Sequence, residues 1–383
     1  MDIQKSFSQG LMKKMKNMID IIFKPCYSQT NSYLQEIVNA LEKNKVNIIN
    51  KNQQEKILEK LIIFIKFIFS SNKRIVHCNW VENITRNKTV KSRFIAKILL
   101  LKADILHILG IKICWTMHNS MPHDCTDVVF AEHFINRWLL RVDMVVVHSR
   151  DSMSLLVNKY RYNENKILFV PHGAYKINSI NQSKKNELVH KYEIHTGDIV
   201  FLYFGVISKY KNIPLLLETF SGLQDTNMKL ILAGKIDGSI ESQMQYKIRL
   251  QCSQLTNVIL DERFIPEEEI STIFSLCDIV ILPYDKTSMQ NSGAMIQAFS
   301  NGKPVIIPEF GYVLDIKEKD FVFSYDYNSP ESEKRELMIQ INNTVNRKDE
   351  LKSLGILAKE FADTELNWNL IGKKIVQAYK NIK

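Results

Sequence analysis

Cysteine is scarce in this sequence and is not arranged in pairs. The six cysteines are spread over 383 residues, and no two of them form a CxxC pair. Structural zinc sites and disulfide frameworks use such paired spacing, so neither is expected. Most of the cysteines lie in or beside apolar runs. The simplest interpretation is a reduced protein of the cytoplasm.

Long hydrophobic runs are also missing. No run approaches the roughly 20 apolar residues that span a bilayer, and the longest candidate, residues 58–69, is interrupted by Lys60 and Lys66. We expect no signal peptide, because the first residues are polar and basic and the apolar stretch 18–23 is short. The hydrophobic content of 45% and charged content of 24% indicate a soluble globular protein.

Acidic residues are too few in the first half to balance the basic ones. Residues 1–175 hold 26 Lys and Arg against 14 Asp and Glu, a balance of +12, whereas residues 176–383 hold 25 against 27, a balance of −2. Such a bias suits an anionic membrane surface, a polyanionic substrate or nucleic acid. No nucleic-acid-binding motif accompanies it. We therefore expect no nucleic acid partner and rank the membrane surface first.

One basic stretch could form the contact with a membrane. Residues 90–109 alternate lysines and arginine with large apolar residues, which is typical of a helix lying on a membrane surface. The alternative is a crossover helix that packs on a sheet and turns its lysines outward.

Residues 279–308 are the most informative stretch. Apolar runs at 278–283 and 305–307 predict buried parallel strands, and Ser292 with Gly293 begins a predicted helix. In doubly wound sheets, ligands lie beyond the carboxyl ends of the strands. A serine cap followed by glycine exposes backbone N–H groups of the kind that bind phosphate. An ordinary strand–helix unit with a capping serine is the alternative.

This stretch resembles the donor-site segment of GT-B glycosyltransferases, above all the bacterial enzymes of family 4 or group 1. The resemblance rests on residues 283–284 (Pro-Tyr), 292–294 (Ser-Gly-Ala) and 302–306 (Gly-Lys-Pro-Val-Ile). It implies an α/β protein with two Rossmann-like doubly wound domains facing a cleft. Residues 1–175 would bind the acceptor and residues 176–365 the nucleotide sugar. A final helix within 366–383 would cross back to the first domain.

The resemblance also implies a donor site. Gly205 follows an apolar run, where the family's glycine leaves room for the donor, and Lys211 stands where a basic residue holds the diphosphate. The implied donor-binding residues are Gly205, Lys209, Lys211, Ser292, Gly293, Ala294 and Gln297. Exposed lysines in an ordinary turn are the alternative for Lys209 and Lys211.

The chain departs from the family pattern at one donor position. The family has two glutamates eight residues apart, and their places are taken by Met289 and Gln297. Gln297 can still hydrogen-bond a ribose hydroxyl, whereas Met289 cannot replace a carboxylate. This departure leaves three questions open: which donor is used, whether transfer retains or inverts the configuration of the sugar, and whether the protein is an inactive homologue.

The acceptor side is predicted from two strand ends. Trp80 follows the predicted strand 74–78, and His118, Asn119 and His123 follow the predicted strand 111–117, as in the family's acceptor-facing loops. His118 is our candidate for the residue nearest the reacting carbon, as general base or hydrogen-bond donor. A core-closing Trp80 and a turn-capping His118 are the alternatives.

A zinc site is a further alternative in this loop. His118, His123 and Cys125 with Asp127 have suitable side chains, but their spacing matches no closed structural site. We therefore predict no metal at these residues.

Together these features predict a glycosyltransferase of the hexosyltransferase type. The donor would be a nucleotide-diphospho-sugar and the acceptor a surface glycan, free or on a lipid carrier. No DxD motif is evident, so no divalent ion and no cofactor besides the donor is expected. The protein would be cytoplasmic, with peripheral contact to the inner face of the membrane. The alternatives are a sugar-nucleotide epimerase of the same fold and a non-catalytic partner subunit.

Overall fold

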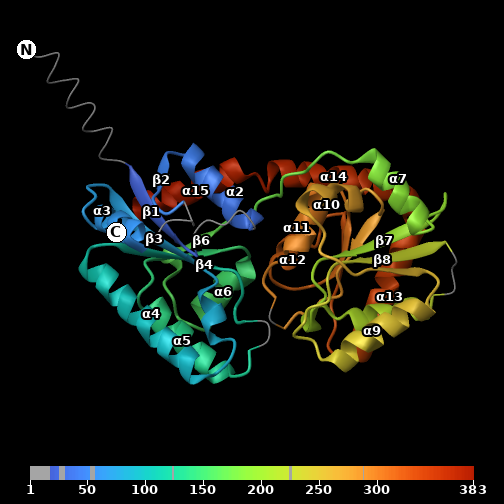
Figure 1. Ribbon diagram of the computed structural model, residues 1–383, viewed down its shortest axis with the longest axis horizontal. Helices are drawn as coiled ribbons and strands as arrows, with labels where there is room; N and C mark the ends of the chain where they lie inside the picture. Colours follow the sequence, from blue (N-terminus) through green and yellow to red (C-terminus); the bar gives the residue numbers. More distant parts are fainter. Residues whose placement is uncertain (1–17, 26–30, 52–56, 123–124, 224–226, 288) are drawn as a thin grey trace, which may run out of the picture. The chain divides into compact units, whose positions relative to one another are not determined.

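The chain forms two units, each built on one parallel β-sheet (Figure 1). The computed structural model describes residues 18–25, 31–51, 57–122, 125–223, 227–287 and 289–383. Unit 1 comprises Met1–Gly173 and Asn367–Lys383, and unit 2 comprises Ala174–Leu366. Each sheet has six strands and is flanked by helices. The predicted α/β fold with two doubly wound sheets is confirmed.

The sheet of unit 1 has the strand order β2-β1-β3-β4-β5-β6, and every neighbouring pair is parallel. Its strands are β1 (Ile19–Lys24), β2 (Val46–Ile48), β3 (Lys73–Asn79), β4 (Lys112–Met117), β5 (Met144–Val147) and β6 (Ile167–Phe169). The central strands are buried on both faces, which explains why they are continuous apolar runs rather than alternating ones.

Two layers of helices cover the faces of this sheet. The helices of unit 1 are α2 (Ser32–Lys43), α3 (Ile57–Ile68), α4 (Val90–Ile108), α5 (Val128–Leu139), α6 (Arg150–Asn158) and α15 (Trp368–Asn381), with the short helices η1 (Val81–Thr85) and η2 (Glu164–Lys166). One core cluster joins the sheet to α4 and α5 and contains Trp115 and Trp138. The other joins it to α2 and α15 and contains Phe23 and Tyr379.

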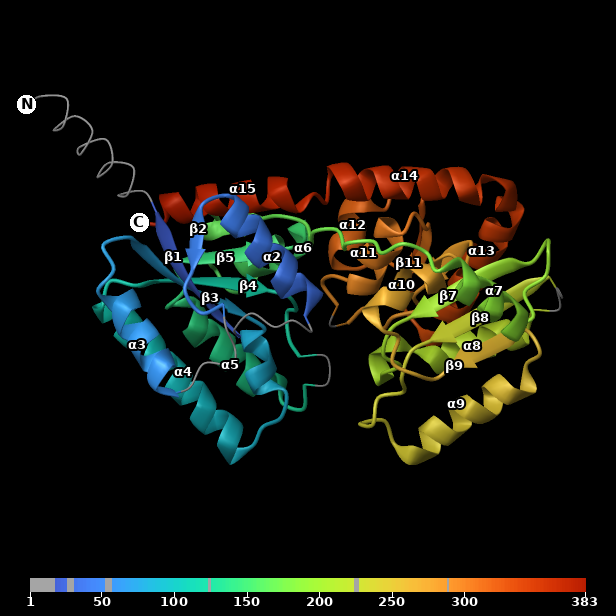
Figure 2. The ribbon, with the colours of Figure 1, turned by 45° about the horizontal axis from the view of Figure 1, so that its top comes forward.

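The C-terminal helix α15 belongs to unit 1, as the resemblance implied. It packs against α2 (Figure 2) and buries Ile371, Ile375 and Tyr379. Gly372 allows this approach, because a Cβ there would lie 2.9 Å from the Ala40 carbonyl oxygen.

The sheet of unit 2 has the strand order β12-β11-β10-β7-β8-β9, again with parallel neighbours. Its strands are β7 (Ile199–Phe204), β8 (Met228–Ala233), β9 (Val258–Asp261), β10 (Ile279–Ile281), β11 (Val305–Pro308) and β12 (Val322–Tyr325). The strand order reverses direction between β7 and β10. At such a switch point, loops leave the two strands toward opposite faces and open a crevice for a ligand.

Helices cover the second sheet on both faces. They are α7 (Gln182–Lys191), η3 (Lys209–Lys211), α8 (Ile213–Ser221), α9 (Ser242–Gln254), α10 (Glu267–Phe274), α11 (Gly293–Ser300), α12 (Gly311–Ile316), α13 (Pro330–Asn346), η4 (Lys348–Glu350) and α14 (Leu351–Thr364). Helix α13 packs on β12, β11 and α8, and α14 packs on α11. Gly355 fits α14 against the turn at Gly302, because a Cβ there would lie 2.3 Å from the Gly302 carbonyl oxygen.

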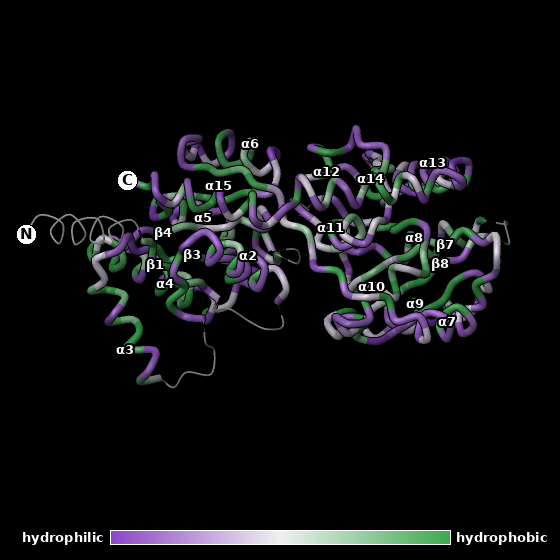
Figure 3. The backbone as a smooth tube through the Cα atoms, turned by 90° about the horizontal axis from the view of Figure 1, so that it is seen from above, coloured by the Kyte–Doolittle hydropathy of each residue, from purple (hydrophilic) through white to green (hydrophobic). Residues whose placement is uncertain are grey.

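Unit 1 keeps several large apolar side chains in contact with solvent. Along α3, hydrophobic and hydrophilic segments interleave (Figure 3), and Leu58 is 67% exposed. On α4, Phe94 is 63% exposed and Ile108 is 84% exposed. Among the described residues, no helix is at once long enough and apolar enough to cross a membrane.

Candidate active site

The candidate donor site of unit 2 begins at the carboxyl end of β7. Gly205 has a φ of +125°, a conformation that suits glycine, and nothing lies within 4 Å of the position its Cβ would take. Its carbonyl oxygen meets Gly234 at the end of β8, where a Cβ would lie 2.0 Å away. The two glycines therefore let the ends of β7 and β8 approach closely, with open space beside Gly205.

Lys211 lies at the end of η3, in the turn after β7. Its ammonium nitrogen is 3.7 Å from the centre of the Tyr284 ring and 4.8 Å from that of Tyr210. No ion pair between Lys211 and a carboxylate occurs among the residues described. Burial lowers the pKa of Lys211 to about 7. When protonated, Lys211 thus lies over two aromatic rings and forms no ion pair with a carboxylate of the described residues.

The loops after β7 and β10 meet at this point, the switch point of the sheet. The Asp285 N–H donates to the Tyr210 carbonyl at 2.8 Å. The Tyr284 side chain, fully buried, lies between Lys211 and the Ser292 hydroxyl, which is 3.4 Å from the Tyr284 hydroxyl. Lys211 and the start of α11 are therefore joined through one tyrosine ring.

Ser292 is the N-cap of α11, as the sequence predicted. Its hydroxyl accepts a hydrogen bond from the Met295 N–H at 3.2 Å. Gly293 follows, and a Cβ there would lie 3.0 Å from the Tyr175 hydroxyl. Ala294 is partly buried in the first turn and Gln297 is buried in the second. Gly293, Ala294 and Gln297 lie on one short helix that Ser292 caps, and this helix follows β10 and therefore begins beyond the carboxyl end of that strand.

Two further residues of the donor segment lie differently. Lys209 is exposed at the start of η3, away from the half-buried position of Lys211. Met289 is buried, and its N–H lies 3.4 Å from the Lys286 carbonyl oxygen. The Met289 side chain is buried within the loop after β10 and has no oxygen or nitrogen that could hydrogen-bond a sugar.

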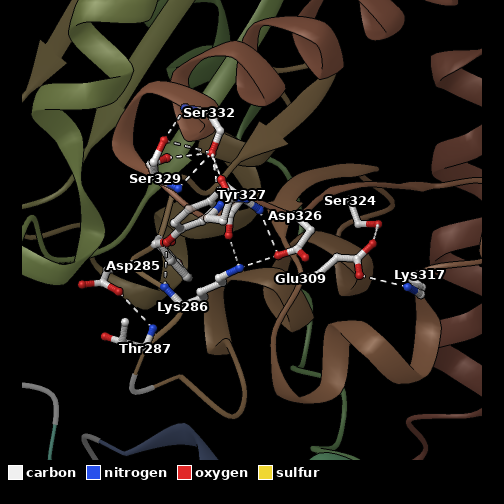
Figure 4. Close-up of polar contacts among 12 residues, drawn as sticks. Asp285, Lys286, Thr287, Glu309, Lys317, Ser324, Asp326, Tyr327, Ser329 and Ser332 are labelled. Carbon is white, nitrogen blue, oxygen red and sulfur yellow. Dashed lines mark hydrogen bonds and ion pairs between the residues drawn. The ribbon is translucent and has the colours of Figure 1, made fainter.

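Sequence reasoning missed a polar network beside this loop (Figure 4). The Lys286 ammonium forms an ion pair with Asp326, and the Lys286 N–H donates to the Tyr327 hydroxyl at 3.1 Å. Glu309 pairs with Lys317 at 2.9 Å. These residues follow β10, β11 and β12, so the network ties together the loops at the carboxyl edge. The sequence does not reveal this network, because the three loops are far apart in the chain and only the strand order of the sheet brings them together.

In unit 1, five rings surround Tyr33 near the start of α2. Their centroids lie 4.8 to 5.9 Å from that of Tyr33. The surrounding rings are Trp80, His118, His148, His172 and Trp368. Four of them follow or end β3, β4, β5 and β6 in turn, so the cluster occupies the carboxyl edge of the first sheet.

His118 stacks on Trp80 with ring centroids 4.4 Å apart. Its Nε2 lies 3.1 Å from the Asn79 side-chain oxygen and therefore carries the proton in that contact. Burial, together with His148, His172 and His77, holds the pKa of His118 well below its usual value. The imidazole is neutral at neutral pH, so Nδ1 is free of a proton and can accept one.

Burial also holds His77, His148 and His172 of unit 1 neutral. The pKa of His77 is lowered to about 3, that of His148 to about 4 and that of His172 to about 3. His77 contacts the hydroxyls of Tyr379 and Thr116, the latter at 2.6 Å. His148 Nδ1 donates to the Val170 carbonyl oxygen at 2.9 Å. These contacts are with other groups of unit 1, so we infer that the imidazoles of His77, His148 and His172 help to hold the ring cluster around Tyr33 in place.

Trp80, Asn119 and His123 were the predicted acceptor residues. Trp80 has a φ of +50° and ends β3 with its ring on His118. Asn119 is partly buried in the turn after His118. His123 lies outside the described residues. Trp368, which sequence reasoning did not select, joins the same cluster from α15, and a Cβ at Gly173 would lie 2.2 Å from its indole.

A buried carboxyl underlies the turn at His118. Glu82 in η1 is fully buried, and burial raises its pKa to about 8. The main-chain N–H groups of Asn119 and His118 and the Trp115 indole oppose this shift, which places them near the carboxyl. The Trp115 indole nitrogen has no hydrogen-bond partner within the described part of the chain. No group of three or more His, Cys, Asp or Glu there could hold a metal ion.

The second unit carries the sequence signature of a known family. Residues 184–351 match the model of the family described as "Glycosyl transferases group 1". A GDP-mannose:glycolipid 4-beta-D-mannosyltransferase of Xanthomonas campestris pv. campestris is 23% identical over 238 residues, 61% of this chain. The match spans 61% of that relative's length.

Solved structures extend the similarity to almost the whole chain. A glycosyltransferase from Rickettsia africae superposes with a TM-score of 0.65 and 17% identity, covering 96% of this chain and 98% of that one. HepE of Anabaena, solved in complex with UDP, gives a TM-score of 0.67 and 13% identity, covering 94% and 98%. The chain has the GT-B glycosyltransferase fold. The resemblance to the group 1 enzymes that the sequence predicted is confirmed.

Within this GT-B fold, the selected residues that the structure describes lie at or just beyond the carboxyl ends of the strands of their own sheet. The cavity of about 900 Å³ in unit 2 lies elsewhere, at the amino ends of β10 and β11, where Asp278 and Lys303 line it. None of the predicted donor residues lines this cavity. Because ligands of doubly wound sheets bind at the carboxyl ends, we place the site at Lys211 and α11.

Proposed function

We propose that the protein is a glycosyltransferase that moves a sugar from a nucleotide-diphospho-sugar to a glycan acceptor. Unit 2 binds the donor, with the diphosphate at Lys211 and α11. Unit 1 binds the acceptor at the cluster around Tyr33. The product is a surface polysaccharide or its lipid-linked precursor.

The Lys211 ammonium is the observation that carries this proposal. A lysine that is half-buried, lacks a carboxylate partner among the described residues and contacts the same tyrosine as the N-cap of α11 is suited to an anionic ligand. We infer that a diphosphate bound at this edge of the sheet contacts the Lys211 ammonium with one phosphate group and the first N–H groups of α11 with the other. Because Lys211 is a point charge, it stabilises the negative charge that develops as the nucleoside diphosphate departs.

The relatives support the ligand classes. The Xanthomonas relative is named for GDP-mannose as donor and a glycolipid as acceptor, and HepE is solved with UDP. A nucleoside diphosphate on one side and a lipid-linked glycan on the other are therefore the ligands to test first.

The proposed mechanism assigns His118 to the acceptor. Its neutral imidazole accepts the proton of the attacking hydroxyl, while Trp80 holds the ring by stacking. Asn79 binds Nε2 and leaves Nδ1 to the substrate side. We propose that no divalent ion takes part, so that activity persists in the presence of a chelator.

We also propose that unit 1 contacts an anionic membrane surface. Phe94, Leu101 and Ile105 recur at helical spacing on α4, and each is more than a third exposed. Lys91 and Lys97 on the same helix are exposed as well. Apolar side chains with lysines around them match the interface of acidic lipids. Sedimentation with phosphatidylglycerol vesicles, but not with phosphatidylcholine vesicles, is the expected result.

A donor panel tests the proposal directly. The purified protein is incubated with GDP-mannose, UDP-glucose and related donors, with and without a lipid-linked glycan extract, and the products are identified by mass spectrometry. Transfer or slow hydrolysis of one donor is expected. Formation of the 2-epimer of the donor indicates an epimerase instead, and no binding of any nucleoside diphosphate overturns the proposal.

A further inference from the structure

Helix α13 carries a buried carboxyl group close to the candidate donor site. Glu333 is only 6% exposed and begins the buried stripe of this helix, which continues with Leu337, Ile341 and Thr344. Glutamate is rarely buried in such a stripe unless it has a partner. A buried glutamate at this position indicates a role that requires the carboxyl group.

The partner of Glu333 is Asn212, the residue that directly follows Lys211. The Asn212 side-chain amide donates to the Glu333 carboxyl at 3.2 Å. Asn212 has a φ of +54° and joins η3 to α8, yet its side chain makes no capping bond to α8. Asparagine is one of the few residues besides glycine that adopt the left-handed conformation readily. The Asn212 side chain is thus directed to Glu333, in addition to the main-chain bond from the Asn212 N–H to the Lys209 carbonyl oxygen at 3.2 Å.

Glu333 interacts with residues of both loops near Lys211. Burial raises the pKa of Glu333 to about 7, and nearby Asp285 raises it further, while Asn212 and Lys286 oppose the shift. Asn212 belongs to the loop after β7, and Asp285 and Lys286 belong to the loop after β10. The start of α13, at Ser329 and Ser332, borders the same network in Figure 4.

We propose that Glu333 is a positioning residue for Lys211: through Asn212 it holds the left-handed turn that keeps the Lys211 ammonium over the Tyr284 ring. The inference rests on the proposed nucleoside diphosphate site and names a residue that its ligand never touches. Without the Glu333–Asn212 bond, the turn samples other conformations and Lys211 loses its fixed place. The affinity for a diphosphate then falls, although the fold is kept.

A pair of substitutions at Glu333 separates positioning from folding. Leucine extends the apolar stripe and removes the bond, so Glu333→Leu should keep or raise the melting temperature while GDP and UDP bind about tenfold more weakly. Glu333→Gln keeps an oxygen that can accept from Asn212, and binding should stay within about twofold of the wild type. Glu331→Leu, at an exposed position on the same helix, is the matched control and should change neither quantity.

The route through Asn212 has its own test. Asn212→Gly keeps the left-handed turn accessible but removes the bond, so binding of GDP and UDP by calorimetry should weaken by a similar factor. Adding Glu333→Leu to this variant should cause no further loss, because the two residues act as one unit.

The outcomes separate the two proposals. If the wild type binds GDP or UDP and Glu333→Leu binds it equally well, the positioning role is wrong and the proposed function stands. If Glu333→Leu unfolds, Asn212→Gly decides in the same way, and undiminished binding overturns the inference. If the wild type binds neither nucleotide, both proposals fall.

Discussion

The candidate sites of unit 1 and unit 2 each lie at the carboxyl edge of a parallel sheet but differ in charge. In unit 1 the edge is lined by neutral rings, with the pKa of His77, His148 and His172 lowered by burial. In unit 2 the edge holds the Lys211 ammonium. The difference matches a neutral sugar acceptor on one side and an anionic donor on the other.

The comparison also shows that the charge of a region does not locate an anion site. Residues 1–175 carry a balance of +12 and residues 176–383 a balance of −2, yet Lys211, the cation of the proposed donor site, lies in the second half. Most lysines of the first half are exposed to solvent, and an exposed lysine contributes little free energy to an ion pair at a surface. One lysine over an aromatic face, half removed from water, is a stronger ligand for phosphate than many exposed ones.

The largest predicted difference between the two units is the change in their free energy of unfolding when the pH is lowered. Unfolded histidine titrates near pH 6.5, so between that value and the folded pKa values of about 3 to 4 the unfolded chain binds the extra protons. The free energy of unfolding of unit 1 then falls as the pH falls, by about 1.4 kcal/mol per pH unit for each buried histidine. Glu82, with a pKa near 8, offsets one such contribution.

Unit 2 should respond in the opposite sense over this range. The raised pKa of Glu333, about 7, means that its folded state binds the proton first and gains stability in acid. Hydrogen exchange with mass spectrometry at about pH 6.5 and pH 4.5, corrected for intrinsic rates, should show larger losses of protection in β3–β6 than in β7–β10. Equal losses in both sheets would contradict the contrast.

Removal of the His118 imidazole should have the next largest effect. If His118 accepts the proton of the acceptor, His118→Ala should lower kcat by about 100-fold or more and change KM little. The exposed His133 of the same unit provides the control, since His133→Ala should leave both constants unchanged. A kcat within about twofold of the wild type would remove His118 from the mechanism.

Removal of the Lys211 ammonium should weaken the donor side. Lys211→Ala should raise the Kd for GDP or UDP by about 10- to 100-fold, the range for a charged hydrogen bond. Lys209→Ala should have a smaller effect because its side chain is exposed, and Lys247→Ala on the outer face of α9 serves as control. Unchanged affinity in calorimetry would exclude Lys211 from the site.

The smallest predicted effect is the uptake of a proton when a nucleoside diphosphate binds. At about pH 8 most Lys211 side chains are neutral, because the pKa is lowered to about 7, and an anion restores the charged form. Calorimetry in buffers of different ionisation enthalpy should show uptake of nearly one proton per nucleoside diphosphate. Lys211→Arg, which stays charged, should bind with almost no uptake. The same uptake in the arginine variant would assign the proton to another group.

Much of the site followed from local sequence. The Ser292 cap, the glycine at the end of β7 and the position of Lys211 six residues later depend on neighbours in the chain, and the structure places them at one edge of one sheet. The predicted roles of these residues stay predictions. The polar network of Lys286, Asp326 and Tyr327 was missed, because its members lie in two different loops.

The sequence by itself determined the strands, the helix caps and the order in which they occur, since apolar runs and capping residues act over a few positions. Only the tertiary structure decided which side chains meet. Glu333 lies 121 positions from Asn212, and Trp368 reaches the rings of unit 1 from the far end of the chain. Such contacts depend on strand order and on the faces that helices bury, and no local pattern encodes either.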